Sequence, residues 1–172
     1  MNPKLAFLHN RRSIRQYEAR ELGEPIVRDL LEAAMSAPSA CAKDPWHFVV
    51  VRDRQRLQTL AAGLPNGRML GSAAAGFVVC GRLAEAHGNQ ESYLLQDCGA
   101  AIENLLLAAT ALGLGACWLG VHPRTERMEH VRTVLGVPAD TLPVAVVAVG
   151  WPLERPPART RYNPAKVHAE HW

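Results

Sequence analysis

The stretch SYLLQDCGAAIENLLLAATALGLGACWLG, residues 92–120, decides the fold of this chain. Apolar side chains recur in it at alternating spacings of three and four residues, which predicts a helix of about five turns. These positions are Leu95, Cys98, Ile102, Leu105, Ala109 and Leu112. We expect Ser92 to cap the helix at its N-terminus and Gly113 to end it. The run GACWLG then predicts an inner strand ending at Gly120, where glycine permits close backbone approach to a ligand.

The polar residues of this helix lie on one narrow side. At about 100° per residue they fall within an arc of about 120°. They are Gln96, Asp97, Glu103 and Asn104. The apolar remainder is wider than one small sheet needs, and soluble monomers rarely expose apolar patches above a few hundred Å². We therefore expect part of this helix to face a second copy of the chain.

Helices and strands intermix along the rest of the chain. The expected strands cover residues 46–51, 73–80, 115–119 and 142–150, and the further helices cover residues 25–37, 52–63 and 126–135. We expect Thr125 to cap the last helix, and Trp46 and Trp118 to belong to the core. Together these elements predict a single α+β domain over residues 1–172, a sandwich with helices on both faces of a mixed sheet. The proline-rich residues 151–172 are expected to form an extended C-terminal arm.

The composition is that of an ordinary globular protein, with 48% hydrophobic and 20% charged residues. A net charge of +3 is too small to indicate nucleic-acid binding by itself. The chain has neither a long uncharged apolar segment nor the apolar core of a signal peptide, so we expect a cytoplasmic protein without membrane association. The cysteines show no CxxC spacing, which favours free thiols, and His168 and His171 lack a third ligand, so no metal site is expected.

Arginines cluster near both ends of the chain. Arg11, Arg12 and Arg15 surround Ser13, an arrangement that suits a phosphate because guanidinium donates bidentately and keeps its charge. The residue types alone also describe a solvated basic turn. Between the first long helix and the first strand, residues 38–45 form a stretch of small and turn-forming residues, and such loops often carry function.

Five motifs in order carry a resemblance to a known family. They are RRSIR (11–15), APSA followed by PWHFVVV (37–40 and 45–51), GLGACWLG (113–120), VAVGWP (147–152) and RTRY (159–162). The chain resembles the FMN-dependent nitroreductase family over essentially its whole length, as a short, single-domain member. This resemblance implies a three-layer sandwich and an obligate homodimer with a domain-swapped tail, which binds FMN in a cleft between the subunits.

By this resemblance, residues from both ends of the chain hold the flavin phosphate. Arg11 meets the phosphate, and Ser13 meets the phosphate or the ribityl chain. Arg159 and Arg161 close on the same phosphate. Arg12 belongs to the same N-terminal flavin motif.

The resemblance also places residues around the flavin ring. Arg15 reaches the pyrimidine edge, and Arg68 is a further candidate for the N1–C2=O edge, where a cation stabilises reduced flavin. The backbone N–H at Leu119 and Gly120 faces flavin N5, and a side chain at Gly120 would collide with the ring. The second subunit contributes the loop that matches Pro38, Ser39 and Ala40.

The resemblance implies that no residue of the chain is catalytic, because the chemistry takes place on flavin N5. NADH or NADPH donates hydride by a ping-pong route to a small-molecule acceptor, namely a nitroaromatic, a quinone or an activated enone. The family's loop usually carries Asn and Gln where this chain has Ala42 and Asp44, and Asp44 could pair with Lys43 or Arg68 or cap the turn. Two alternatives remain, namely an oxidoreductase of this fold that consumes or fragments reduced FMN, and a non-enzymatic FMN-binding protein.

Overall fold

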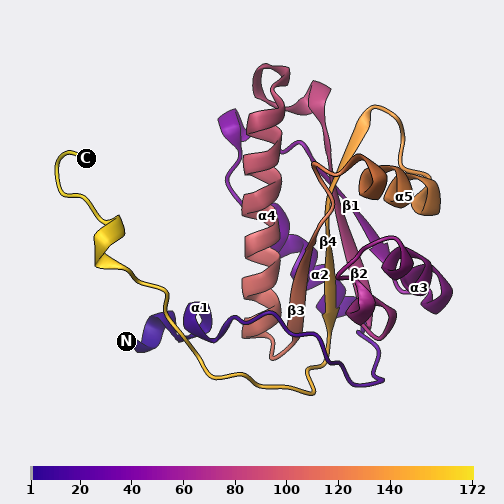
Figure 1. The fold of residues 1–172 in the computed structure, drawn as a ribbon, viewed down its shortest axis with the longest axis horizontal. Helices are drawn as coiled ribbons and strands as arrows, with labels where there is room; N and C mark the ends of the chain where they lie inside the picture. The colour runs from indigo at the N-terminus through magenta and orange to yellow at the C-terminus, as the bar shows by residue number, and fades with distance from the viewer. Residues whose placement is uncertain (1) are drawn as a thin grey trace.

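The computed structural model describes residues 2–172 of the chain (Figure 1). The helices are α1 (Ala6–Asn10), α2 (Glu24–Met35), α3 (Arg54–Ala62), α4 (Glu91–Ala111) and α5 (Thr125–Leu135). The strands are β1 (Trp46–Val51), β2 (Ala75–Arg82), β3 (Gly115–Gly120) and β4 (Thr141–Gly150). Short 3-10 turns cover Pro3–Leu5, Ala40–Ala42, Arg68–Gly71, Leu83–Glu85, His87–Asn89 and Pro164–Lys166. The expected elements are therefore present, and their boundaries lie within a few residues of those expected.

The four strands form one sheet in the order β1-β2-β4-β3. Every pair of neighbouring strands is antiparallel. Within residues 2–172, parallel pairing is limited to an isolated bridge between Ser13 and Ala116, which joins the N-terminal segment to β3. The expected α+β architecture is confirmed, but the sheet is antiparallel and not mixed apart from this bridge, because apolar periodicity identifies strands without specifying the direction in which they pair.

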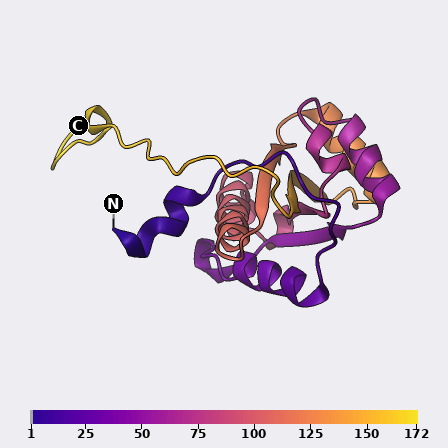
Figure 2. The ribbon, with the colours of Figure 1, turned by 90° about the horizontal axis from the view of Figure 1, so that it is seen from below.

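Two helical layers cover the sheet, as Figure 2 shows. On one face, α2 and α4 pack against the sheet through a core that includes Leu30, Phe77 and Ile102. On the other face, α3 and α5 pack through a second core that includes Leu57 and Val131. This arrangement is the expected three-layer sandwich. It explains the continuous apolar pattern of β4, whose side chains alternate between two buried faces.

Both expected N-caps are wrong by one or two residues. Gln90 is the N-cap of α4, and Ser92 already lies inside the first turn. Arg124 is the N-cap of α5, and Thr125 is its first helical residue. In both helices, the residue with the extended backbone that an N-cap requires comes before the residue that was expected. Neither N-cap residue forms a hydrogen bond from its side chain to the first turn of the helix. The expected end of α4 is confirmed at Gly113, which adopts a left-handed φ of 73°.

The two tryptophans that were expected in the core differ. Trp46 is buried, whereas Trp118 is 41% exposed, so the prediction for Trp118 is wrong. Trp118 lies on β3, which is an edge strand of the sheet, and the helical layer leaves its ring uncovered. Sequence periodicity identifies a strand but not its place in the sheet, which is why the exposure was missed.

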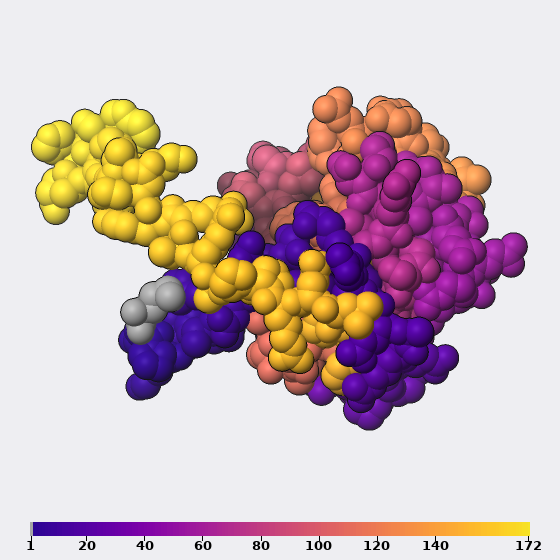
Figure 3. Space-filling model, turned by 60° about the horizontal axis from the view of Figure 1, so that its bottom comes forward, coloured from indigo at the N-terminus to yellow at the C-terminus, as the bar shows by residue number. Residues whose placement is uncertain are grey.

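The C-terminal arm first runs along the N-terminal segment, where Leu153 N–H donates to Gln16 O and Arg159 N–H to His9 O, and its end then projects away from the body of the molecule (Figures 1 and 3). Beyond a 3-10 turn at Pro164–Lys166 this arm has no helix or strand. Beyond the half-buried Trp151, its large apolar side chains are exposed, and Tyr162 and Trp172 show 73% and 97% of their surface to solvent. None of the helices within residues 2–172 has the length and apolar character needed to cross a membrane.

Candidate functional site

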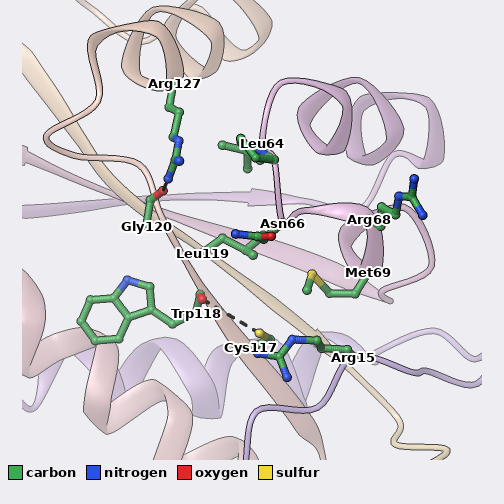
Figure 4. A pocket seen from close by; sticks show the side chains of 11 residues that line it. Arg15, Leu64, Asn66, Arg68, Met69, Cys117, Trp118, Leu119, Gly120 and Arg127 are labelled. Atoms are coloured by element: carbon green, nitrogen blue, oxygen red, sulfur yellow. Dashed lines mark hydrogen bonds between the residues drawn. The ribbon is translucent and has the colours of Figure 1, made fainter.

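A cleft of about 610 Å³ lies beside the end of β3 (Figure 4). Its lining comes from the N-terminal segment, β3, the loop after α3 and the start of α5. Four of the residues expected at the flavin ring line it, namely Arg15, Arg68, Leu119 and Gly120. The cleft is therefore built where the sequence predicted the ring-binding part of the site.

The cleft is strongly cationic. Arg15, Arg68 and Arg127 line it, and no acidic residue does. No ion pair within residues 2–172 neutralises any of these three guanidinium groups. Such a cleft favours ligands that carry negative charge or electron-rich edges.

The floor of the cleft is the end of β3. Arg127 donates a hydrogen bond of 2.9 Å from Nη1 to the carbonyl oxygen of Gly120, and thereby fixes the last residue of the strand. A Cβ atom added at Gly120 would meet nothing within 4 Å. The chain itself thus gives no steric reason for glycine at this position, and the space next to it is open.

A second, smaller hollow of about 210 Å³ brings the two ends of the chain together. Arg11 and Arg12 line it from the N-terminal segment, and Arg159 and Arg161 line it from the arm. Backbone contacts join the two segments, because Arg159 N–H donates to the His9 carbonyl oxygen at 3.2 Å and the Arg12 guanidinium donates to the Pro157 carbonyl oxygen. Four arginines around one small hollow are suited to an anion, because guanidinium groups form strong, charge-assisted hydrogen bonds.

One carboxylate already lies near this hollow. Glu103 of α4 places Oε1 at 3.7 Å from Nε of Arg11. Both side chains are partly exposed, so the pair contributes little to stability. A phosphate at this hollow would share Arg11 with Glu103.

The segment that joins the hollow to the cleft runs beside β3. Ile14 N–H donates to the Ala116 carbonyl oxygen at 3.0 Å, and Ser13 forms the parallel bridge with the same residue. This pairing presents Arg11 at the hollow and Arg15 at the cleft. Cys117 of β3 also lines the cleft, and burial raises the pKa of its thiol, so it stays protonated at neutral pH.

The loop of Pro38, Ser39 and Ala40 does not line the cleft of its own chain. Asp44 closes this loop, because its Oδ1 accepts from the Ser39 hydroxyl and its N–H donates to Ser39 Oγ at 3.0 Å. Of the three roles considered for Asp44, capping the turn is the one observed.

The same loop holds an unusual backbone conformation. Cys41, Ala42 and Asp44 have φ values of 54°, 50° and 48°. Left-handed conformations cost about 1–3 kcal/mol each for residues other than glycine, and they cluster at functional sites.

Sequence reasoning missed two polar residues of the cleft that offer hydrogen-bonding groups to a ligand. Asn66 and Arg127 line it, as Figure 4 shows, but only a turn signal marked Asn66 and only a helical pattern covered Arg127. Neither signal indicates a site. Arg127 reaches the cleft because α5 packs against α3 and β4, and Asn66 reaches it because the loop after α3 folds beside the end of β3.

Comparisons with known proteins agree with this geometry. The family model described as "Nitroreductase family" matches residues 8–78 and 55–151. A protein of Archaeoglobus fulgidus named "Putative NADH dehydrogenase/NAD(P)H nitroreductase" is 42% identical over 177 residues, covering 100% of both chains. A crystal structure of a protein with the same name from Parabacteroides distasonis is 38% identical, with a TM-score of 0.93 and 100% coverage of both chains.

A third relative was solved with a bound cofactor. A nitroreductase structure from Desulfovibrio desulfuricans, in complex with FMN, is 33% identical with a TM-score of 0.84. It covers 100% of this chain and 99% of its own. The family model and the identity to these relatives both extend over nearly the whole sequence, and the chain belongs to the nitroreductase family.

Proposed function

We propose that this chain is an FMN-dependent oxidoreductase that takes hydride from NADH or NADPH by a ping-pong route and reduces nitroaromatics, quinones or activated enones. Relatives named NAD(P)H nitroreductase and the FMN complex of the D. desulfuricans protein support the donor and the cofactor. The observation that carries the proposal is the pairing of a four-arginine hollow with a neighbouring open cleft at Gly120.

The residues present fit FMN. A cleft of about 610 Å³ falls within the range of about 300–1,000 Å³ that small-molecule sites occupy. The hollow of Arg11, Arg12, Arg159 and Arg161 offers more donors than a phosphate can use. The open space beside Gly120 leaves room for a flat ring against the backbone.

Bound FMN supplies a ring nitrogen, N5, that accepts a hydride and later donates it. The chain then needs to bind and orient the cofactor. Arg11, Arg159 and Arg161 hold the phosphate, and Ser13 holds the phosphate or the ribityl chain. Arg15 and Arg68 would lie at the pyrimidine edge of the ring, where their charge would favour the reduced, anionic form. The backbone N–H at Leu119 and Gly120 faces N5.

The proposal includes a homodimer with a shared cleft. Pro38, Ser39 and Ala40 lie away from the cleft of their own chain, so a second copy is needed to bring this loop to it. The exposed Trp118, the exposed apolar side chains of α1 and those of the arm offer the surface that a second copy would cover.

The test starts from the purified protein incubated with FMN. We expect a bound-flavin spectrum, bleaching on anaerobic mixing with NADH or NADPH, and recovery when a nitroaromatic or a quinone is added. Absence of bound flavin would refute the proposal. Bound flavin that neither nicotinamide bleaches would identify a non-enzymatic FMN-binding protein. Loss of the flavin ring when the reduced protein meets air would identify a flavin-fragmenting enzyme, whereas simple reoxidation returns FMN.

A further inference from the structure

Asp97 of α4 is a buried carboxylate of which only one oxygen has a hydrogen-bond partner. The residue is 5% exposed. Its Oδ1 accepts a hydrogen bond of 2.9 Å from Ala40 N–H, and its Oδ2 is buried without any partner. No ion pair within residues 2–172 compensates its charge. Burial of a half-satisfied carboxylate opposes folding, so stability alone does not explain an aspartate here.

The hydrogen bond to Ala40 N–H indicates what Asp97 does in the structure: it connects α4 to the loop of residues 39–44. The other hydrogen bonds of residues 39–44 stay inside the loop, such as those from Ala42 N–H to Ser39 O and from Lys43 N–H to Ala40 O. Within the described part of the chain, Asp97 is thus the one hydrogen-bonding tie between residues 39–44 and a distant element, whereas Pro45, where the loop enters β1, accepts from Arg82 N–H at 3.0 Å.

The loop needs such a tie. Cys41, Ala42 and Asp44 all have left-handed backbone conformations, which are unfavourable for residues other than glycine. Residues in such conformations persist only when their surroundings fix them. α4 is the longest helix of the sandwich and is packed on the sheet, so it gives Asp97 a rigid base from which to hold Ala40.

We infer that Asp97 is a positioning residue: through Ala40 N–H it holds the loop of Pro38, Ser39 and Ala40 in the conformation that completes the FMN site of the opposite subunit. This inference rests on the proposed function, because it takes from there the shared cleft and its cofactor. It adds a residue that lies outside the cleft and touches no ligand.

The experiment compares substitutions that keep or remove the acceptor. Asp97→Asn keeps an oxygen that can accept from Ala40 N–H, whereas Asp97→Leu fills the space and Asp97→Ala leaves it empty, both without an acceptor. Either Asp97→Leu or Asp97→Ala can be used as the variant without an acceptor, provided that it folds. Asn104→Ala is the matched control, because Asn104 lies on the same helix and its side chain also bonds a distant backbone group, here as the donor to the Ala33 carbonyl oxygen at 3.1 Å.

Two measurements report on the loop. The first is the dissociation constant for FMN. The second is the reaction rate of Cys41 with a thiol reagent in the FMN-free protein, because Cys41 lies in the loop and is the exposed cysteine among residues 2–172. The melting temperature of each FMN-free variant shows whether it folds.

We expect Asp97→Leu or Asp97→Ala to weaken FMN binding by about tenfold or more and to change the Cys41 rate. Asp97→Asn should keep both quantities close to the unsubstituted protein, and Asn104→Ala should lower the melting temperature alone. The inference is overturned if Asp97→Leu and Asp97→Ala match the unsubstituted protein in FMN affinity and Cys41 rate. It is also overturned if Asp97→Asn or Asn104→Ala loses as much FMN affinity and changes the Cys41 rate as much as they do. Should the unsubstituted protein bind no FMN, the proposed function fails, while the Cys41 rates still show whether Asp97 holds the loop.

Mixed dimers test where the loop acts. A dimer of one Asp97→Ala chain and one Arg161→Ala chain has one complete site, since intact arginines of the first meet an intact loop of the second. A dimer that carries both substitutions on one chain has none. We expect FMN to bind tightly only to the first kind of mixed dimer. Equal FMN binding by the two kinds of dimer would overturn the action across subunits.

Discussion

The Gly120→Ala substitution distinguishes an effect on the stability of the fold from an effect on the affinity for FMN. A Cβ atom at this position meets nothing within 4 Å in the chain, and Gly120 is not among the residues with a positive φ. Replacing a glycine by alanine at a compatible position stabilises by about 0.4–1 kcal/mol, because the unfolded chain loses freedom. The FMN-free protein should therefore be as stable as the unsubstituted one, or slightly more stable.

The substitution should instead weaken the binding of FMN. If the ring lies against the backbone of Leu119 and Gly120, the added methyl group occupies space that the ring needs. Overpacking of this kind costs about 1–3 kcal/mol, which corresponds to an increase of about 5- to 150-fold in the dissociation constant. Titration of the FMN-free protein, followed by flavin fluorescence, measures this change.

Gly81→Ala is the matched control. An added Cβ at Gly81 would lie 2.6 Å from Cδ2 of Leu94, inside the core between β2 and α4. This variant should unfold at a lower temperature and keep its affinity for FMN. A Gly120→Ala protein that binds FMN as tightly as the original would show that the ring does not lie against β3. Loss of the dimer in the absence of FMN would show instead that the second subunit fills the space.

Three further substitutions or conditions test the site, the core and the arm. Arg161→Ala should weaken FMN binding by about 1.5–3 kcal/mol, the scale of a hydrogen bond to a charged group, and an unchanged titration would remove Arg161 from the site. Burial raises the pKa of the Cys80 thiol to about 11 and that of Cys98 to about 12, from 9.0, so the folded state keeps protons that the unfolded chain releases. The free energy of unfolding should thus be fully retained below pH 9 and fall above it, by up to about 1.4 kcal/mol per pH unit and thiol, and urea denaturation of the Cys98→Ala protein should show a smaller fall. Truncation after Gly150 should reduce both dimer stability and FMN affinity, because it removes the apolar side chains of the arm together with Arg159 and Arg161; sedimentation and FMN titration measure the two losses, and an unaffected dimer would exclude the arm from the interface.

Strong periodicity made the fold predictable. The run WHFVVV predicted the bounds of β1 without error, and the spacing of apolar residues located α4 to within two residues at each end. Caps were harder, because Gln90 and Arg124 take the extended backbone that precedes each helix although serine and threonine lie close by. The antiparallel order β1-β2-β4-β3 depends on pairing between distant segments, which no local pattern specifies.

The candidate site was predictable only where motifs mark it. RRSIR and RTRY pointed to a shared anion site, and the structure brings their arginines to one hollow. Arg127 and Asn66 reach the cleft through tertiary packing, so their sequence context carries no sign of it. Asp97 was visible as part of a polar arc, but its partner Ala40 lies 57 residues away, and a hydrogen bond of that span cannot be read from spacing.

A site divided between two subunits, as proposed, would have a thermodynamic consequence. If the loop that Asp97 holds acts across the interface, FMN binds the dimer and not the separate chain, and each equivalent of bound FMN stabilises the dimer by mass action. At a free FMN concentration of 100 times the dissociation constant, this stabilisation amounts to about 2.7 kcal/mol per site. The FMN-free dimer therefore has to rely on its apolar contacts, for which Trp118, Tyr162 and Trp172 are available because they are exposed in the single chain. The fraction of protein with bound FMN and the fraction present as dimer should then rise together as FMN is added to a dilute protein, since FMN binding requires the loop of the second subunit.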